Sequence, residues 1–419
     1  MFKPAAAVLL AGVLAHAQPP APTISKFDKG ASLTMLRQIK ADLRDNYFDK
    51  TYRGMDLDGV FGEAERRLKA SSSSIETTTI LADVLLRLND SHTMFIPPDR
   101  VTRVDYGWAA TIVGDEPFVL FVKEGSDARK KGMAQGDRIL FWNRNEPNRR
   151  NLWQLNYYYT YIRPQVMQRV IVRKPGGAEQ VLDIASKTEA RPNQLSDFLE
   201  EILTSTEIKI DREQKHGDTL IWKYTAFGDR KAVERAMKIA RGAKSLIIDL
   251  RGNGGGLVDT LNALVSHLFD REVHVVTETG RKGEKVERAK GRRDAFRGPL
   301  IVLVDSRSAS AAEILARLVQ VEKRGSVIGD RTAGAVMTSR VFPHALGIES
   351  IALYATSITV GDVRMSNGES LEHKGVTPDE ILLPTGADMA AGRDPVLARA
   401  LTLLGGAITA EQAGSLYRK

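Results

Sequence analysis

The stretch that decides the fold is PLIVLVDSRSASAAEIL, residues 299 to 315. It opens with an apolar run that is typical of a strand covered on both faces, and residues 311–319 then have the composition of a helix. The small residues between them permit a tight turn. A hydroxyl at Ser310 would therefore lie beside the free N–H groups of a helix N-terminus, where a developing oxyanion is stabilised. The alternative is that the serines of this turn only cap the helix.

A second stretch, SLIIDLRGNGGG at residues 245–256, is another buried-type strand that ends in a glycine run before a helical segment at 257–269. Glycines allow close approach and positive φ angles, so this loop can point N–H groups at a ligand. It has neither the Lys-Ser/Thr ending of a phosphate-binding loop nor the glycine spacing of a dinucleotide site. Two strand-loop-helix units, one with donors and one with a hydroxyl, favour acyl-transfer chemistry.

These two stretches resemble the S41 peptidases, the tail-specific (C-terminal processing) and tricorn-like serine proteases. Two further motifs follow the family's order: LNDSHT at residues 88–93 and LEHKGVTPD at residues 371–379. The resemblance spans most of the chain. It implies a serine peptidase with a ClpP/crotonase-like superhelical α/β core.

One position departs from the family pattern. In the C-terminal processing branch, the resemblance places a catalytic lysine at the end of a turn that here reads Gly329-Asp-Arg-Thr-Ala-Gly-Ala335. Ala335 cannot act as a base, so a Ser-Lys dyad is excluded unless another lysine reaches the site. The resemblance to the tricorn-like branch implies a Ser-His-Glu site instead.

In that site His92 would accept the proton of Ser310 and pass it to the leaving amine, while Glu372 would orient the imidazole. His344 and His373 are rival bases, and Glu369 could replace Glu372 as the acid. Glu372 could also be a structural carboxylate beside the following turn.

The oxyanion donors implied by the resemblance are the N–H of Ala311 and one N–H from Gly255 or Gly256. Asp249 and Arg251 are interpreted as a structural ion pair that fixes the glycine loop. No metal site is apparent, because the histidines and carboxylates lack ligand spacing such as H-E-x-x-H. The proposed mechanism needs no cofactor.

The first residues, 1–17, have a basic start, a short apolar run and an Ala-His-Ala end, which predicts a signal peptide. The protein should then be exported, to the periplasm or the extracellular space. The rest contains no apolar stretch long enough to cross a bilayer. With no cysteine there is no disulfide framework and no thiol nucleophile.

We expect an N-terminal helical region at 24–104, with helices at 31–47, 56–70 and 77–88. Residues 105–187 resemble a PDZ domain, in the layout that ends in Gly136-Asp-Arg-Ile-Leu-Phe-Trp142. Such a module would bind an extended peptide, including its C-terminus. The peptidase core is predicted at 190–390, as a largely parallel sheet with helices on both sides, and a terminal helix and tail at 391–419.

The formal net charge of +8 raises the question of nucleic acid binding. The densest basic stretch, residues 281–297, is interrupted by acidic residues and nearly lacks aromatics for base stacking, so we interpret it as a solvated connection.

Three functions remain open at this point. The leading one is an exported serine endopeptidase that acts on extended or unfolded polypeptides. The second is an inactive S41-like protein that binds peptides or serves as a scaffold, which the missing lysine would allow. The third is a crotonase-type acyl-CoA enzyme, which the export signal argues against. The sequence does not indicate an oligomeric state.

Overall fold

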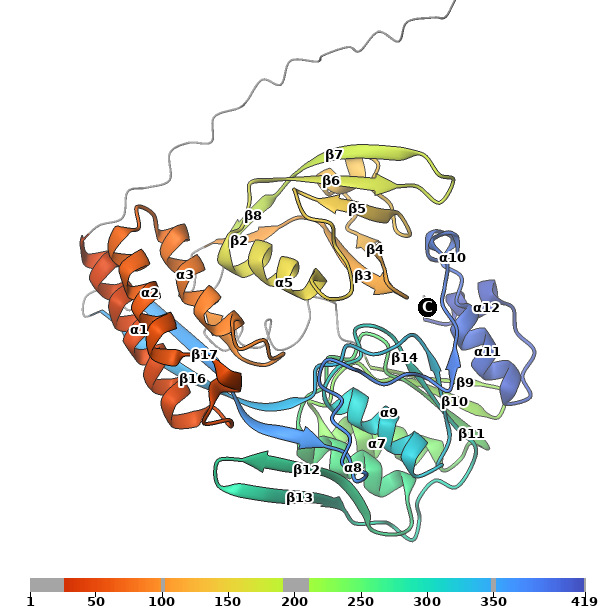
Figure 1. Ribbon diagram of the computed structural model, residues 1–419. Helices are drawn as coiled ribbons and strands as arrows, with labels where there is room; N and C mark the ends of the chain where they lie inside the picture. Colours follow the sequence, from red (N-terminus) through yellow and green to blue (C-terminus); the bar gives the residue numbers. More distant parts are fainter. Residues whose placement is uncertain (1–25, 99–101, 191–210, 348–351, 418–419) are drawn as a thin grey trace, which may run out of the picture.

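The computed structural model describes residues 26–98, 102–190, 211–347 and 352–417 (Figure 1). The predicted signal peptide, residues 1–17, lies outside these ranges, and so do residues 191–210 of the core predicted at 190–390. The described chain forms N-terminal helices, a β-rich module, an α/β core and a long two-stranded arm that runs from the core to the N-terminal helices.

The core is built on a six-stranded sheet with the order β18-β15-β14-β11-β10-β9. Its strands are β9 (Arg212–His216), β10 (Thr219–Lys223), β11 (Ser245–Asp249), β14 (Leu300–Val304), β15 (Ser326–Gly329) and β18 (Glu380–Ile381). All neighbouring strands are parallel except β9, which pairs antiparallel with β10. The prediction of a largely parallel sheet is confirmed.

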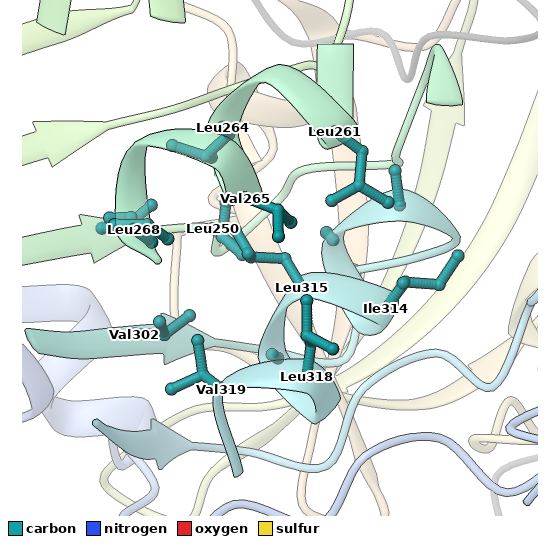
Figure 2. Close-up of a cluster of buried hydrophobic side chains, with 14 of the residues drawn as sticks. Leu250, Leu261, Leu264, Val265, Leu268, Val302, Ile314, Leu315, Leu318 and Val319 are labelled. Atoms are coloured by element: carbon teal, nitrogen blue, oxygen red, sulfur yellow. The ribbon is translucent and has the colours of Figure 1, made fainter. Parts of the chain in front are cut away.

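Helices cover both faces of this sheet. On one face lie α7 (Arg230–Ala240), α8 (Val258–Leu268) and α9 (Ala311–Val321), and on the other α11 (Pro395–Leu403) and α12 (Ala410–Ser415). Side chains alternate between the faces along each strand, as the pleat requires, so Ile248 joins the first cluster and Ile247 the second. Figure 2 shows α8 and α9 packing together, with Leu264 and Leu315 among the buried contacts.

The strands β11 and β14 are direct neighbours in this sheet, with Asp249 opposite Leu303. Because they are parallel, the loops at their C-terminal ends emerge side by side at one edge. These loops are the glycine run and the turn that carries Ser310.

A second sheet joins the core to the N-terminal helices. It has the order β1-β17-β12-β13, and β16 pairs with β17. Its strands are β1 (Met94–Ile96), β12 (Val273–Gly280), β13 (Gly283–Ala289), β16 (Met337–Leu346) and β17 (Ala352–Arg364). The helices α1 (Lys26–Asn46), α2 (Leu57–Ala70) and α3 (Ser74–Leu86) pack against it near the predicted positions, and the short turn η1 (Tyr52–Gly54) lies between α1 and α2.

The β-rich module lies where a PDZ-like domain is predicted. Its antiparallel sheet has the order β3-β4-β5-β6-β7. The elements are β3 (Trp108–Val113), β4 (Glu116–Val122), α4 (Asp127–Lys130), β5 (Arg138–Trp142), α5 (Leu152–Tyr157), η2 (Tyr158–Ile162), β6 (Met167–Arg173) and β7 (Glu179–Ala185). A separate pair, β2 (Thr102–Asp105) with β8 (Lys187–Ala190), closes the base of the module. The remaining helix, α10 (Gly386–Ala391), follows β18.

The basic stretch at 281–297 lies between two core strands and is mostly exposed, in keeping with a solvated connection. It also contains regular structure that was not predicted, because residues 283–289 form strand β13, paired with β12. An exposed edge strand tolerates charges, and charged side chains protect such an edge from further pairing. None of the described helices is long and apolar enough to span a membrane.

Candidate active site

Ser310 stands at the N-cap of α9 in a backbone conformation that few non-glycine residues adopt, with φ 55° and ψ −118°. Such strain persists only where the surroundings enforce it, and it is concentrated at functional sites. Here the Ser310 N–H donates to the carbonyl of Ala335 at 2.9 Å and to Glu313 Oε2 at 3.1 Å. Two different segments therefore hold this serine in place.

The neighbouring serines have structural partners. The hydroxyl of Ser306 donates to the carbonyl of Ile112 in the β-rich module, and that of Ser308 donates to the carbonyl of Leu250. These bonds fix the turn against the module and against the glycine loop. Ser310 differs from both in its strained backbone.

The glycine loop presses directly against Ser310. Gly255 has a φ of 97°, and a Cβ built on it would lie 2.6 Å from Ser310 Cβ and 3.0 Å from Ala311 N. Only glycine permits this approach. Asn253, fully buried, ties the two loops together, because its carbonyl accepts from Ala309 N and its side chain bonds Tyr224 O and Gly255 N.

This geometry distinguishes the two glycines proposed as oxyanion donors. The N–H of Gly255 already donates to Asn253 Oδ1 at 2.8 Å. By contrast, among the contacts of the described residues, neither Gly256 N nor Ala311 N has an acceptor within the protein. The free donors beside Ser310 are therefore those of Gly256 and Ala311.

His92 lies in the turn that follows α3. Its Nδ1 is 2.6 Å from the hydroxyl of Ser91, and that hydroxyl donates to Glu372 Oε2 at 2.9 Å. A serine hydroxyl has one proton, and an ionised carboxylate can only accept, so Nδ1 must be the donor in its contact with Ser91. This assigns the proton of a neutral imidazole to Nδ1 and leaves Nε2 as the acceptor, which is the tautomer that a general base needs.

Glu372 is buried and is bonded from two sides. Its Oε1 accepts from the backbone N of Ser91 and its Oε2 from the backbone N of Val336, both at 2.9 Å. Glu369 instead forms an ion pair with Arg317 at 2.7 Å. Of the two carboxylates that the sequence left open, Glu372 is the one beside His92.

One peptide group connects the acid to the serine. The carbonyl of the Ala335–Val336 peptide accepts from Ser310 N, and its N–H donates to Glu372. Ala335, which stands where the family has a lysine, therefore contributes to the site through its backbone carbonyl. A chain of hydrogen bonds thus runs from the backbone of Ser310 through this peptide to Glu372 and, by way of Ser91, to His92. Among the described contacts, no hydrogen bond joins the His92 ring to the Ser310 hydroxyl.

The rival histidines have other partners. His344 Nε2 lies 2.7 Å from Asp42, and His373 Nε2 lies 3.0 Å from the carbonyl of Asn89. His16 lies outside the described residues. His373 Nε2 also lies 3.7 Å from Glu372 Oε1. Of the histidines considered as bases, His92 is the one that hydrogen-bonds to the Ser91 hydroxyl.

The surroundings of His92 favour its neutral form. Burial lowers the pKa of His92 below its ordinary value of 6.5, and the charges of Glu372 and Asp90 oppose this only in part. A neutral imidazole near neutral pH can accept a proton from a hydroxyl.

Glu313, one turn into α9, is a fully buried acid that the sequence analysis did not single out. Its Oε1 accepts from the Thr332 hydroxyl and Gly334 N, and its Oε2 from Ala335 N and Ser310 N. Burial raises the pKa of Glu313 to about 7, although these donors lower it. Glu313 thus joins the start of α9 to the loop at 332–335.

The structural ion pair proposed for Asp249 and Arg251 is confirmed. Arg251 binds Asp249 through Nε and a terminal nitrogen, and it binds both oxygens of Asp394. Burial alone would raise the pKa of Asp249, but the charges of Arg251 and Lys223 outweigh it and hold that pKa well below its usual range. The pair fixes the start of the glycine loop and takes no part in the contacts of Ser310.

Sequence reasoning missed Ser91, Asn253 and Glu313. Ser91 immediately precedes His92 within the LNDSHT motif, and Glu313 follows Ser310 by three residues, the spacing of a capping box. These local signals exist. The partners that give the residues their roles are up to 281 positions away, and the sequence does not show those contacts.

Comparisons with known proteins show what this chain is similar to. Residues 218–382 match the family model described as Peptidase family S41. The chain is 29% identical over 180 residues to a carboxyl-terminal-processing protease of Synechocystis, covering 42% of this chain and 40% of that relative. It is 22% identical over 370 residues to the carboxy-terminal processing protease CtpA of Bacillus subtilis, covering 84% of this chain and 68% of that relative.

Among solved structures, the fold is similar to that of mature CPAF, with a TM-score of 0.66 and 16% identity, covering 86% of this chain and 94% of that one. Residues 218–382 of this chain therefore form a domain of the kind that the peptidase family S41 model describes. The aligned region with the Synechocystis relative spans less than half of that relative's length.

Proposed function

We propose that this chain is an exported serine endopeptidase that cleaves extended or unfolded polypeptides through an acyl-enzyme intermediate. Ser310 is the nucleophile, His92 the general base and then the general acid, and Glu372 the carboxylate that acts on His92 through Ser91. The observation that carries the proposal is the Glu372–Ser91–His92 chain of hydrogen bonds, which leaves His92 Nε2 free to accept a proton.

The proposed reaction uses these groups in the following order. Ser310 Oγ bonds to the carbonyl carbon of the substrate and its proton passes to His92 Nε2. The carbonyl oxygen becomes negative and accepts from the free N–H groups of Gly256 and Ala311. His92 then donates its proton to the leaving amine as the C–N bond breaks. Water attacks the resulting ester by the same route, and the acid product and free Ser310 are released.

Glu372 and Ser91 support the charged intermediate. When His92 becomes an imidazolium, its Nδ1–H still donates to Ser91, whose hydroxyl still donates to the carboxylate. The negative charge of Glu372 stabilises the imidazolium across this link. We place no lysine in the mechanism, because Ala335 occupies the position at which the family has one.

The β-rich module is suited to presenting a peptide to this site, as the PDZ resemblance implies. Arg149, from the loop after β5, donates to the carbonyls of Gly114 and Arg331 and pairs with Asp330 at 2.8 Å. Gly114 N also donates to Asp330. These bonds join the module to the segment that leads into the loop at 332–335.

The test is cleavage of an unfolded protein by the mature enzyme, comparing the wild type with Ser310→Ala, His92→Ala and Lys374→Ala. We expect the first two substitutions to abolish cleavage and the third to leave it within about two-fold of wild type. Loss of activity in Lys374→Ala would point to a lysine base instead.

An inactive, peptide-binding protein is the second candidate, and the absence of the lysine at Ala335 favours it. In that case purified wild type would cleave nothing, and a serine-directed probe would not label Ser310. A crotonase-type acyl-CoA enzyme would instead turn over an acyl thioester and leave polypeptides intact.

A further inference from the structure

The turn that carries His92 is organised by a buried carboxylate, Asp90. Its Oδ1 accepts from the backbone N of His92 at 3.0 Å and of Thr93 at 2.6 Å, and from the hydroxyl of Thr359 at 2.8 Å. These contacts set the backbone of the histidine turn. Asp90 is only 4% exposed, so they are formed out of water.

The second oxygen of Asp90 is held by the N-terminal helices. Oδ2 accepts from the hydroxyl of Tyr47 at 2.9 Å. Tyr47 follows the last residue of α1 and is fully buried. Through this hydrogen bond, the Tyr47 hydroxyl links the C-terminal end of α1 to the turn that carries His92.

The end of α1 is itself fixed from another part of the fold. Arg281, between β12 and β13, donates to the carbonyls of Tyr47 and Leu43. An arginine that binds the last carbonyls of a helix caps it and complements its dipole. Phe48 N in addition donates to the carbonyl of Thr359 on β17. The backbone that carries Tyr47 is therefore held by the β12–β13 turn and by β17.

We infer that Tyr47 is a positioning residue for His92, acting through Asp90. This rests on the proposed function, in which His92 is the base. While Tyr47 binds Oδ2, the carboxylate of Asp90 is fixed in one orientation. In that orientation Oδ1 accepts from the histidine turn. The N-terminal helices are thus part of the apparatus that aims the base.

The isosteric variant Tyr47→Phe tests this, because it keeps the buried ring and removes the one hydrogen bond. We expect kcat on a peptide substrate to fall on the order of ten-fold with KM unchanged, since small misplacements of a reacting group are costly. The matched control is Tyr52→Phe. Tyr52 stacks on Tyr47 with ring centroids 6.2 Å apart, and its hydroxyl has no hydrogen bond among the contacts of the described residues.

A second readout separates positioning from general loss of structure. The Tyr47 hydroxyl offsets part of the charge of Asp90, and that charge raises the pKa of His92. Tyr47→Phe should therefore move the acid limb of kcat/KM to higher pH. The titration of the His92 ring followed by NMR should move the same way. This variant leaves the other charged or titratable groups around this turn and Tyr47 unchanged. These groups are Glu372, His373, Arg53 and Asp49.

Asp90→Asn should move the acid limb in the direction opposite to that of Tyr47→Phe. It also provides a second test in case Tyr47→Phe fails to fold. Its amide oxygen can serve the histidine turn, and its NH₂ can donate to Tyr47, so the position is kept while the charge is lost. We expect the acid limb of kcat/KM to lie at lower pH than in the wild type, because the charge that raises the pKa of His92 is removed. Wild-type cleavage, abolished by Ser310→Ala, establishes the underlying function separately. The inference is overturned if Tyr47→Phe behaves as Tyr52→Phe does, or if both shifts have the same sign.

Discussion

Both carboxylate oxygens of Glu372 accept hydrogen bonds from Ser91, one from its backbone N and one from its hydroxyl, each at 2.9 Å. The acid therefore reaches His92 through a serine. In the described contacts Glu372 has no direct hydrogen bond to the His92 ring. This arrangement gives the hydroxyl of Ser91 a defined task, which is to accept from His92 Nδ1 and to donate to the carboxylate.

Ser91→Ala should lower kcat about ten- to hundred-fold with little change in KM, because the imidazole loses the partner that fixes its tautomer. Ser91→Thr keeps the hydroxyl and should recover most of the activity. The measurement is steady-state cleavage of a fluorogenic peptide. Equal losses in the two variants would show that the hydroxyl is not what matters.

Glu372→Gln should lower kcat strongly and should also move the acid limb of kcat/KM to lower pH. The sign follows from the charge, because the carboxylate raises the pKa of His92 and an amide does not. The matched control is Glu369→Gln, whose carboxylate pairs with Arg317, and its kcat should stay within about two-fold of wild type. A pH profile recorded for all three proteins checks both parts.

Gly255→Ala should abolish cleavage. The added Cβ would lie 2.6 Å from Ser310 Cβ in a backbone with φ 97°, so either the glycine loop or the serine turn must move. The neighbouring Gly254→Ala is a close control, since its Cβ meets nothing within 4 Å. Active-site labelling compared in the two variants measures the effect, and an unlabelled Gly254→Ala would contradict this account.

Glu313 predicts a pH dependence of stability. Its folded pKa of about 7 is above the ordinary value of 4.5. The stability it contributes is therefore complete below about pH 4.5 and is lost as the pH rises through 7, by up to about 3 kcal/mol. Glu313→Gln should flatten this slope of the unfolding free energy between pH 5 and 7. Urea unfolding at several pH values tests it, and parallel curves for the two proteins would count against the assignment.

The ion pairs of Asp249 predict the opposite trend at acid pH. Its pKa is lowered, so the stability it contributes is present above about pH 4 and is lost as the pH falls below that value. Arg251→Ala should destabilise the fold by about 3–5 kcal/mol, because it leaves a buried charge unpaired. Arg129→Ala, which breaks an exposed pair with Glu124, should cost less than about 1 kcal/mol. Denaturant midpoints separate the two cases.

The core could be predicted because its signals are local. The apolar runs of β11 and β14 each end in a distinctive loop, and parallel neighbours bring such loops together. His92 and Glu372 were selected because family motifs surround them. Ser91 and Glu313 lie inside or beside the same motifs, and their significance depends on long-range contacts, so the sequence alone did not reveal it.

The strands at the molecular surface were harder to predict. Most residues of β13 are exposed and four of the seven are charged, so its pattern is that of a solvated loop. Arg281 looked like one more charge in that stretch. Its role at the end of α1 depends on a contact with residues more than 230 positions earlier in the chain, which no periodicity encodes.

The separation of 281 positions between Ser91 and Glu372 has a consequence for biosynthesis. A ribosome that has translated both the histidine and the serine has not yet made the acid that holds them in register. Chains that stop early, or that fold only in part, would carry a nucleophile without an aligned base. On the proposed mechanism, such fragments would not cleave polypeptides, and activity would arise only once the whole domain has folded.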